Sequence, residues 1–392
     1  MNLLANYCIV LHYSEIGVKG GNRKFFENQL AKNIRAALGD LFPARVQRVY
    51  GRFVIPLGGD FDWPAISARL QKVVGLANFA LAEMAAQDAE RILETACRQM
   101  QGQKFSTFRV TTRRIQKSFP LSSDALSAKV GEAIRRQSGA KVDLDHPEAV
   151  CYIEIVDNFA LVYREKIPGL RGLPVGGSGK AVSLLSAGID SPVASYKIIT
   201  RGVKLIFVHF HSIPYTSPAS VANAKRLVER LAEYQLSAKL YCVPFLEIQQ
   251  AILLSAPAEY RVVLYRRAML RIAEKIAKKE KAQALVTGES IGQVASQTLA
   301  NLRVIDEAAA LPVLRPLSGS SKEEIIALAQ QIGTFEISTE PYEDCCSLFV
   351  PAHPATAALP GMVVEAERKL DWKPLIAKAL MGAEVGWFGV VE

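Results

Sequence analysis

The 392-residue sequence has few cysteines and no long apolar run. Its six cysteines are scattered except for the adjacent pair Cys345 and Cys346, and no C-x-x-C spacing occurs. This excludes both a secreted disulfide framework and a cysteine-based zinc site. No apolar stretch has the length of a membrane span, and the N-terminus lacks a basic region followed by an apolar core. These absences predict a soluble, cytoplasmic protein without a membrane partner, whose cysteines are reduced and mostly buried.

A kinase-type phosphate loop is also absent. The run 186–191, S-A-G-I-D-S, lies between the apolar segment 181–185 and Pro192, and no lysine follows its glycine. A strand that delivers small residues to the start of a helix points backbone N–H groups and the positive helix end at an anion. The run therefore predicts a loop that holds a pyrophosphate leaving group. An ordinary strand-to-helix turn is the alternative that these six residues leave open.

Acidic residues are scarce in the first half of the chain. Residues 1–178 contain 24 Lys and Arg against 17 Asp and Glu, so +7 of the net charge of +9 lies there. The segment from Lys104 to Lys117 has no acidic residue and also contains Arg109, Arg113 and Arg114, with Phe105, Phe108 and Phe119 interleaved or following. Such a segment is typical of RNA binding, although a solvated strand edge with core phenylalanines explains it equally well.

Hydrophobic periodicity predicts two small α+β domains, residues 1–60 and 61–167. The Gly- and Pro-rich segment 168–180 is then the expected linker. In the first two domains we expect strands at 7–11, 53–57, 108–112, 149–156 and 160–163, and helices at 26–38, 63–70, 88–100 and 123–138.

Residues 181–392 follow a different pattern, a regular alternation of strands and helices. The expected strands are 181–185, 204–210, 238–243 and 283–287, and the expected helices are 192–201, 219–235 and 258–280. This alternation predicts an α/β domain, a parallel sheet with helices on both faces, whose ligands bind at the carboxyl ends of the strands. Residues 350–392 are expected to form a helical tail on this domain.

Nearly the whole chain resembles the tRNA 4-thiouridine synthetases, or tRNA uridine 4-sulfurtransferases. The resemblance is carried by the 186–191 loop, the basic segment T-R-R at 112–114, the run T-G-E-S-I-G-Q-V-A-S-Q-T at 287–298 and P-Y-E-D-C-C at 341–346. It implies a ferredoxin-like domain, a THUMP RNA-binding domain and a C-terminal PP-loop domain of the adenine nucleotide alpha hydrolase type.

Three features differ from relatives within that family. The second loop position, usually glycine, is Ala187, which is tolerated if its φ is negative. The chain ends at Glu392 without the rhodanese domain of some members, so the resemblance is to members without it, and a role in thiamin synthesis is not expected. Val262 and Tyr265 stand where some relatives have an iron–sulfur C-x-x-C, so that cluster is not expected.

The resemblance implies ATP-dependent formation of 4-thiouridine, at position 8 of tRNA, with AMP and pyrophosphate released. Backbone groups of the 186–191 loop are expected to hold the phosphates, with added hydrogen bonds from the Ser186 and Ser191 hydroxyls. Asp190 is expected to bind Mg²⁺, with capping of the following helix as the alternative. The ATP contacts expected from the resemblance and the loop are Leu184, Leu185, Ser186, Gly188, Asp190, Ser191, His209, Phe210, Arg266, Gly288 and Gln297.

Lys322 and the cysteine pair are the remaining catalytic candidates. Ser321 and Glu324 predict a capping box, which puts Lys322 in a first helical turn where the helix dipole disfavours it, so a partner such as phosphate is expected. Cys345 and Cys346 are candidates to carry persulfide sulfur, with Cys345 favoured. The alternative is that both are buried core cysteines without a catalytic role. The expected partners are tRNA, a cysteine desulfurase and a second copy of the chain. Alternatives are another PP-loop tRNA ligase or a non-catalytic tRNA-binding protein.

Overall fold

The computed structural model describes residues 7–345 and 348–389, which divide into two compact units between Pro174 and Val175. The division falls inside the segment 168–180 that the sequence predicts as a linker. No helix in these described ranges is long and apolar enough to cross a membrane. Cys346 lies outside the described residues.

The N-terminal unit is built on one continuous nine-stranded sheet in the order β2-β3-β1-β4-β8-β7-β5-β6, with β9 also paired to β4. Both expected α+β domains therefore share one sheet. The strands are β1 (Tyr7–Tyr13), β2 (Gln47–Val49), β3 (Arg52–Leu57), β4 (Leu76–Ala86), β5 (Thr107–Arg114), β6 (Lys141–Val142), β7 (Ala149–Val156), β8 (Phe159–Tyr163) and β9 (Ile167–Pro168).

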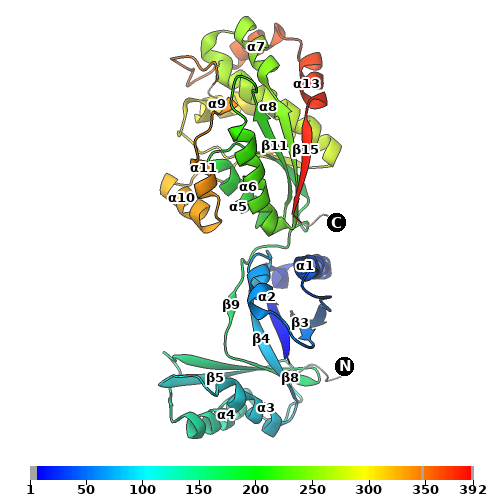
Figure 1. Cartoon of the computed structure of the whole chain (residues 1–392), viewed down its shortest axis with the longest axis vertical. Coiled ribbons are helices and arrows are strands. Elements are labelled where there is room, and N and C mark those ends of the chain that lie inside the picture. The colour runs from blue at the N-terminus through cyan, green and yellow to red at the C-terminus, as the bar shows by residue number, and fades with distance from the viewer. Residues whose placement is uncertain (1–6, 346–347, 390–392) are drawn as a thin grey trace. The chain divides into compact units, whose positions relative to one another are not determined.

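Four α-helices and two short 3-10 turns accompany this sheet. They are η1 (Glu15–Val18), η2 (Gly20–Asn22), α1 (Arg23–Leu38), α2 (Trp63–Leu70), α3 (Ala89–Met100) and α4 (Ser123–Ser138). Side-chain caps set several of the boundaries: Asp88 accepts from the first-turn amides of α3, and Ser122 accepts from that of Ala125 at the start of α4. Gly139 ends α4 in a left-handed conformation. Figure 1 shows α3 and α4 side by side below β5 and β8.

The C-terminal unit contains a six-stranded sheet in the order β14-β13-β10-β11-β12-β15. All of its pairs are parallel except β12 with β15, so the predicted parallel sheet has one antiparallel edge strand. Its strands are β10 (Lys180–Leu184), β11 (Lys204–His211), β12 (Ser237–Pro244), β13 (Ala284–Val286), β14 (Val313–Leu314) and β15 (Glu384–Gly389).

The helices of this unit cover both faces of the sheet, as the sequence predicts. They are α5 (Asp190–Ile199), α6 (Ala219–Gln235), α7 (Leu246–Ser255), α8 (Arg261–Glu280), α9 (Leu299–Asp306), α10 (Lys322–Gln331), α11 (Phe335–Thr339), α12 (Pro360–Arg368) and α13 (Trp372–Met381), with 3-10 turns η3 (Ala258–Tyr260) and η4 (Ala295–Gln297). Figure 1 shows α5 and α6 in front of β11. The segment 350–392 was expected to be helical. It contains α12 and α13, but it also contributes the strand β15.

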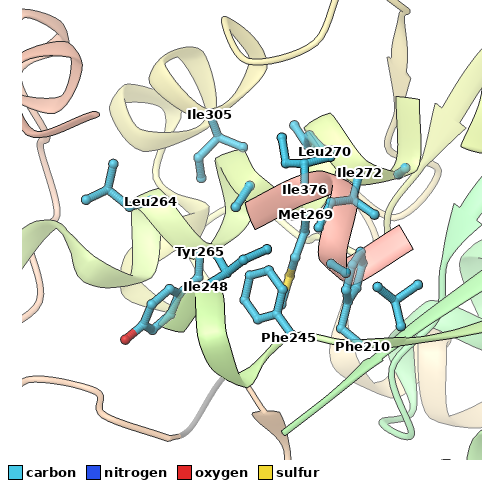
Figure 2. Packing of buried hydrophobic residues seen from close by; sticks show 14 of the residues in the cluster. Phe210, Phe245, Ile248, Leu264, Tyr265, Met269, Leu270, Ile272, Ile305 and Ile376 are labelled. Carbon is cyan, nitrogen blue, oxygen red and sulfur yellow. The ribbon is translucent and has the colours of Figure 1, made fainter. Parts of the chain in front are cut away.

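The main core of this unit lies on the sheet face that α8 covers. Phe210 of β11 packs edge-to-face on Phe245, whose ring in turn packs against Tyr265 of α8. Figure 2 shows these rings together with Met269 of α8 and Ile376 of α13. Burying large side chains of this kind stabilises a fold by about 1.5–3 kcal/mol each. The helices α12 and α13 are thus part of the core of the C-terminal unit.

A buried ion cluster fastens α12 to α8. Arg267 donates two hydrogen bonds of 2.8 Å to the Glu367 carboxylate, and Arg271 donates two more. Arg267 also donates to the backbone carbonyl of Val304, which satisfies the guanidinium further. Because Arg267 and Glu367 each have several hydrogen-bonding partners, these bonds offset the desolvation penalty of burying the charges.

Candidate functional site

The chain order of the C-terminal sheet creates a switch point beside β10. The chain runs from β10 outward through β11 to β12 and then returns to β13 on the other side of β10. In open parallel sheets, ligands bind in the crevice where the strand order reverses, beyond the carboxyl ends of the strands. The loops after β10, β11 and β13 meet at this point.

A cavity occupies this position. It is lined by Leu184, Leu185, Ser186, Gly188, Asp190, Ser191, His209, Phe210, Arg266, Met269, Thr287, Gly288, Glu289, Gln293, Val294, Gln297, Tyr342, Asp344 and Cys345. All eleven residues that the sequence and the resemblance nominate for ATP are among these lining residues. Convergence of several strand-end loops is the arrangement typical of a nucleotide site.

The loop at 186–191 is held in shape by its own serines. Ser191 Oγ accepts from the backbone N–H of Ser186 at 2.9 Å and lies 3.1 Å from Ser186 Oγ, which accepts from the Gly188 N–H at 3.3 Å. The hydroxyls expected to bind phosphate therefore brace the loop in this structure. Ala187 is buried and does not have a positive φ, so the condition for tolerating its methyl group is met.

Gly288 lies so close to this loop that no side chain fits. A Cβ at this position would meet both N and Cα of Ser191 at 2.6 Å. The loop after β13 thus packs backbone against backbone on the first turn of α5, which is a reason for glycine at this position.

Asp190 is the first residue of α5, and its carboxylate does not cap the helix. Its Oδ1 accepts from Lys322 Nζ at 2.8 Å, and its Oδ2 accepts from Gln293 Nε2 at 3.1 Å. The capping alternative is therefore wrong. Lys322 does have the partner that its place in α10 indicates, and in this structure that partner is a carboxylate. The capping box of Ser321 and Glu324 is confirmed.

His209 is buried, and its ring lies against Leu185, the residue that precedes the 186–191 loop. Its Nδ1 lies 2.9 Å from the Leu185 carbonyl, which can only accept, so Nδ1 carries the proton. Burial lowers the pKa of His209 and keeps the ring neutral. Its Nε2 is then an acceptor that has no partner among the described residues.

Several cavity residues were missed by the analysis of single motifs. Gln293 and Glu289 lie within the family run 287–298, so a signal for them existed. Glu289 is buried and accepts hydrogen bonds from Thr287 Oγ1 at 2.9 Å and Arg315 Nε at 2.8 Å. Nothing in the sequence indicated Arg315, because its partners Glu289 and Asp306 are brought to it by the fold.

Cys345 is the cysteine of the pair that the structure describes, and it is 4% exposed. It lines the same cavity as Asp190 and Arg266. Arg266, on α8, is half-buried at this cavity. The other described cysteines, Cys8, Cys97, Cys151 and Cys242, are free thiols outside this cavity.

The nominated RNA contacts lie on and around β5 of the N-terminal unit. Lys104, Arg113 and Lys117 are exposed. Arg109 donates to the Leu144 carbonyl at 2.7 Å, and Arg114 donates to the Phe119 and Leu121 carbonyls at 3.0 and 2.7 Å. Arg114 therefore shapes the loop that follows β5.

The phenylalanines of this segment are core residues. Phe108 and Phe119 are buried, and Phe105 packs edge-to-face on Phe108 at 5.9 Å. The alternative that these rings stack on bases is therefore excluded for the two buried ones. Lys166, which no motif indicated, adds charge here: burial and the nearby Arg113 and Arg109 guanidinium groups lower the pKa of Lys166. We call Arg109, Arg113 and Lys166 the basic cluster.

The fold and the cavity define a PP-loop enzyme of the adenine nucleotide alpha hydrolase type. Three family models match the chain: the ThiI ferredoxin-like domain over residues 8–80, the THUMP domain over 86–165 and the thiamine biosynthesis protein ThiI over 176–372.

Full-length relatives agree with these models. A probable tRNA sulfurtransferase of Thermus thermophilus is 44% identical over 96% of this chain and 93% of its own length. One of Moorella thermoacetica is 43% identical over 96% of both chains. A crystal structure of a 4-thiouridine synthetase–RNA complex with bound ATP is 35% identical, covers 97% of this chain and 99% of its own, and superimposes with a TM-score of 0.90. The chain belongs to the tRNA sulfurtransferase (ThiI) family, which confirms the resemblance and the fold class predicted from the sequence.

Proposed function

We propose that this protein transfers sulfur to tRNA in an ATP-dependent reaction, converting a uridine, at position 8 by family resemblance, to 4-thiouridine. The reaction adenylates uridine O4 with release of pyrophosphate and then replaces the activated oxygen with persulfide-derived sulfur, releasing AMP. The observation that carries this proposal is that the pyrophosphate-type loop and Cys345 line one cavity. A ligase that used the same loop for another acceptor would not need a thiol there.

In the first step, the chain's own groups favour departure of pyrophosphate. The 186–191 loop leads into the N-terminus of α5, whose dipole and backbone N–H groups stabilise negative charge. Lys322 Nζ lies 2.8 Å from the loop residue Asp190, so it is placed to meet the phosphates of a nucleotide bound there. Positive charge at developing phosphate oxygens lowers the barrier to their departure.

The donor set of the loop also fits Mg²⁺. Magnesium in nucleotide enzymes is usually held by one or two carboxylates together with substrate phosphates and water. Asp190 provides one partly exposed carboxylate at the cavity, so it would hold the ion, which supplies charge neutralisation of the phosphates.

In the second step, the thiolate of Cys345 accepts sulfane sulfur from a persulfide donor, a cysteine desulfurase. The terminal persulfide sulfur forms a bond to uridine C4, and AMP departs with the original O4. Attack of a second thiol on the inner persulfide sulfur then breaks the S–S bond, leaving 4-thiouridine and a protein disulfide. Burial of Cys345 keeps water away from the activated uridine.

The N-terminal unit supplies tRNA affinity in this proposal. The basic cluster and the exposed Lys104 and Lys117 offer positive charge to phosphates, which gives salt-dependent, sequence-independent attraction. The target base must leave its stack to reach a buried reaction centre. We propose a cytoplasmic site of action, where tRNA is modified, and a homodimer as the assembly.

The test is mass spectrometry of nucleosides from tRNA incubated with the protein, ATP, Mg²⁺ and a cysteine desulfurase supplied with cysteine. We expect 4-thiouridine, together with tRNA-dependent release of pyrophosphate. Cys345→Ser should abolish 4-thiouridine while pyrophosphate release continues. Full 4-thiouridine formation by this variant would remove Cys345 from the mechanism, and absence of tRNA-dependent pyrophosphate release from the unaltered protein would overturn the proposed reaction.

A further inference from the structure

A buried amide connects the candidate sulfur carrier to two other segments of the C-terminal unit. Gln249, on α7, is 0% exposed. Its Nε2 donates to the backbone carbonyl of Cys345 at 2.8 Å, and its Oε1 accepts from the hydroxyl of Ser212, which is itself fully buried. The three residues come from α7, from the loop after β11 and from the family run 341–346.

The partners determine which way the amide faces. A backbone carbonyl only accepts hydrogen bonds, so the side-chain nitrogen of Gln249 must point to Cys345 and the oxygen to Ser212. Both ends of the amide are thereby satisfied. A buried polar group with defined partners fixes one geometry, because any other orientation leaves a donor or acceptor unpaired.

Gln249 is a polar residue beside Ile248 and Ile252 of the main hydrophobic core. An apolar side chain at position 249 would leave the buried Ser212 hydroxyl and the Cys345 carbonyl without this partner. The hydrogen bond from Gln249 therefore fixes the position of the Cys345 backbone.

A second contact from the same loop supports this. The backbone N–H of Ser217 donates to Glu343 Oε2 at 2.9 Å, two residues before Cys345. The segment 212–217 therefore holds the segment 343–345 at two points, one directly and one through Gln249. Cys345 is also one of the residues that line the cavity.

We propose that Gln249, supported by Ser212, is a positioning residue that holds Cys345 at the cavity for sulfur transfer and has no part in adenylation. This inference rests on the proposed function, in which Cys345 carries the sulfur. It separates the two half-reactions, since Gln249 is not among the residues that line the cavity and its side-chain hydrogen bonds go to Ser212 and Cys345.

The decisive variant is Gln249→Met, which keeps the unbranched shape of the side chain and removes both hydrogen bonds. With the full-length protein, tRNA, ATP, Mg²⁺ and a charged cysteine desulfurase, we expect 4-thiouridine formation to fall by about tenfold or more. Pyrophosphate release should stay within about twofold of its normal rate. Gln250→Met on the same helix is the matched control, because the half-buried Gln250 makes neither bond, and it should leave both rates unchanged.

A second variant tests the hydrogen bond itself. In Gln249→Glu, a protonated carboxyl group can donate to the Cys345 carbonyl, whereas the ionised group cannot and repels it. Sulfur transfer by this variant should therefore be lost as pH rises through the pKa of the new carboxyl group, and should be regained in acid. Neither the unaltered protein nor Gln249→Met should lose sulfur transfer in this way as pH rises. The pH profile of Gln249→Glu therefore remains decisive if Gln249→Met is unstable.

The outcomes distinguish this inference from the proposed function. If Cys345→Ser still makes 4-thiouridine, the sulfur-carrier assignment fails, whatever Gln249 does. If Cys345→Ser is inactive but Gln249→Met transfers sulfur normally, or loses pyrophosphate release in parallel, Gln249 is not a positioning residue for the thiol. A pH profile of Gln249→Glu identical to that of the unaltered protein would also overturn it.

Discussion

Asp190 shows how a single position acquires meaning only in the folded chain. From the sequence it was a candidate metal ligand or a helix cap. The structure binds its two oxygens to Lys322 and Gln293, 132 and 103 residues further along the chain. The sequence indicated that Lys322 has a partner, because the helix dipole disfavours a cation there, but not which one. Long-range partners are set by topology, which local pattern does not encode.

His209 gives a pH dependence whose sign follows from its burial. Its pKa is lowered in the fold, so the unfolded chain takes up a proton near pH 6.5 that the folded chain excludes. The stability that His209 contributes is therefore complete above about pH 6.5 and is lost as pH falls below that value.

The matched variant is His209→Asn, whose amide can donate to the Leu185 carbonyl as Nδ1 does but does not titrate in this range. Thermal unfolding between pH 7.5 and 5.5 should show the melting temperature of the unaltered protein falling faster than that of the variant. His211, whose pKa burial also lowers, is common to both proteins and cancels in the comparison. If the melting temperatures of both proteins fell equally with pH, His209 would not contribute to the pH dependence of stability.

Helices and strands with a strong period were predicted well. The helices at 63–70, 123–138 and 219–235 and the strand at 149–156 have the predicted bounds in the structure. Their signals are local: apolar spacing, a capping residue at Ser122, or a continuous β-branched and aromatic run. The eleven candidate ATP contacts came together in one cavity for a related reason, since strand-end loops of a parallel sheet meet at one edge.

Among the elements that the sequence did not predict, β4, β15 and α7 each lack such a signal. β4 has the sequence LANFALAEMAA, and alanine is depleted in strands. β15 contains two glycines, and it becomes a strand by pairing with β12. α7 has many apolar residues and therefore a weak period. In all three, pairing or packing in the folded chain decides the structure.

The close packing of the loop after β13 on α5 predicts the effect of one methyl group. Gly288→Ala would put Cβ 2.6 Å from Ser191 N and Cα, so either the 186–191 loop or the β13 loop must move. We expect ATP affinity, measured by calorimetry, to fall by about tenfold or more, which corresponds to about 1.4 kcal/mol.

Gly319→Ala is the control for this substitution. A Cβ at Gly319 meets nothing within 4 Å, and the residue has no positive φ. This variant should bind ATP normally. Equal affinities for both variants and the unaltered protein would contradict the close approach as a determinant of the site.

Charge is distributed unequally over the molecule, and this predicts separable binding activities. Arg113 is exposed in the basic cluster, whereas Arg114 next to it is engaged by the carbonyls of Phe119 and Leu121. Arg113→Glu should weaken tRNA binding by about tenfold or more at moderate salt, with ATP affinity and melting temperature unchanged. Filter binding over a range of salt concentrations measures this.

The neighbouring substitution should behave differently. Arg114→Glu removes two hydrogen bonds to a loop and places a carboxylate against two carbonyls, so we expect a lower melting temperature of the N-terminal unit. If Arg113→Glu lowered ATP affinity as much as tRNA affinity, the division of labour between the two units would be wrong.

The strand β4 limits how the N-terminal unit can be divided. It hydrogen-bonds β1 along one edge and β8 and β9 along the other, and the matches to the ferredoxin-like and THUMP models end at residue 80 and begin at residue 86, within or at the end of this strand. The two family matches therefore meet at one strand. Separating residues 8–80 from residues 86–165 would leave an open sheet edge at the cut, and an open edge invites aggregation.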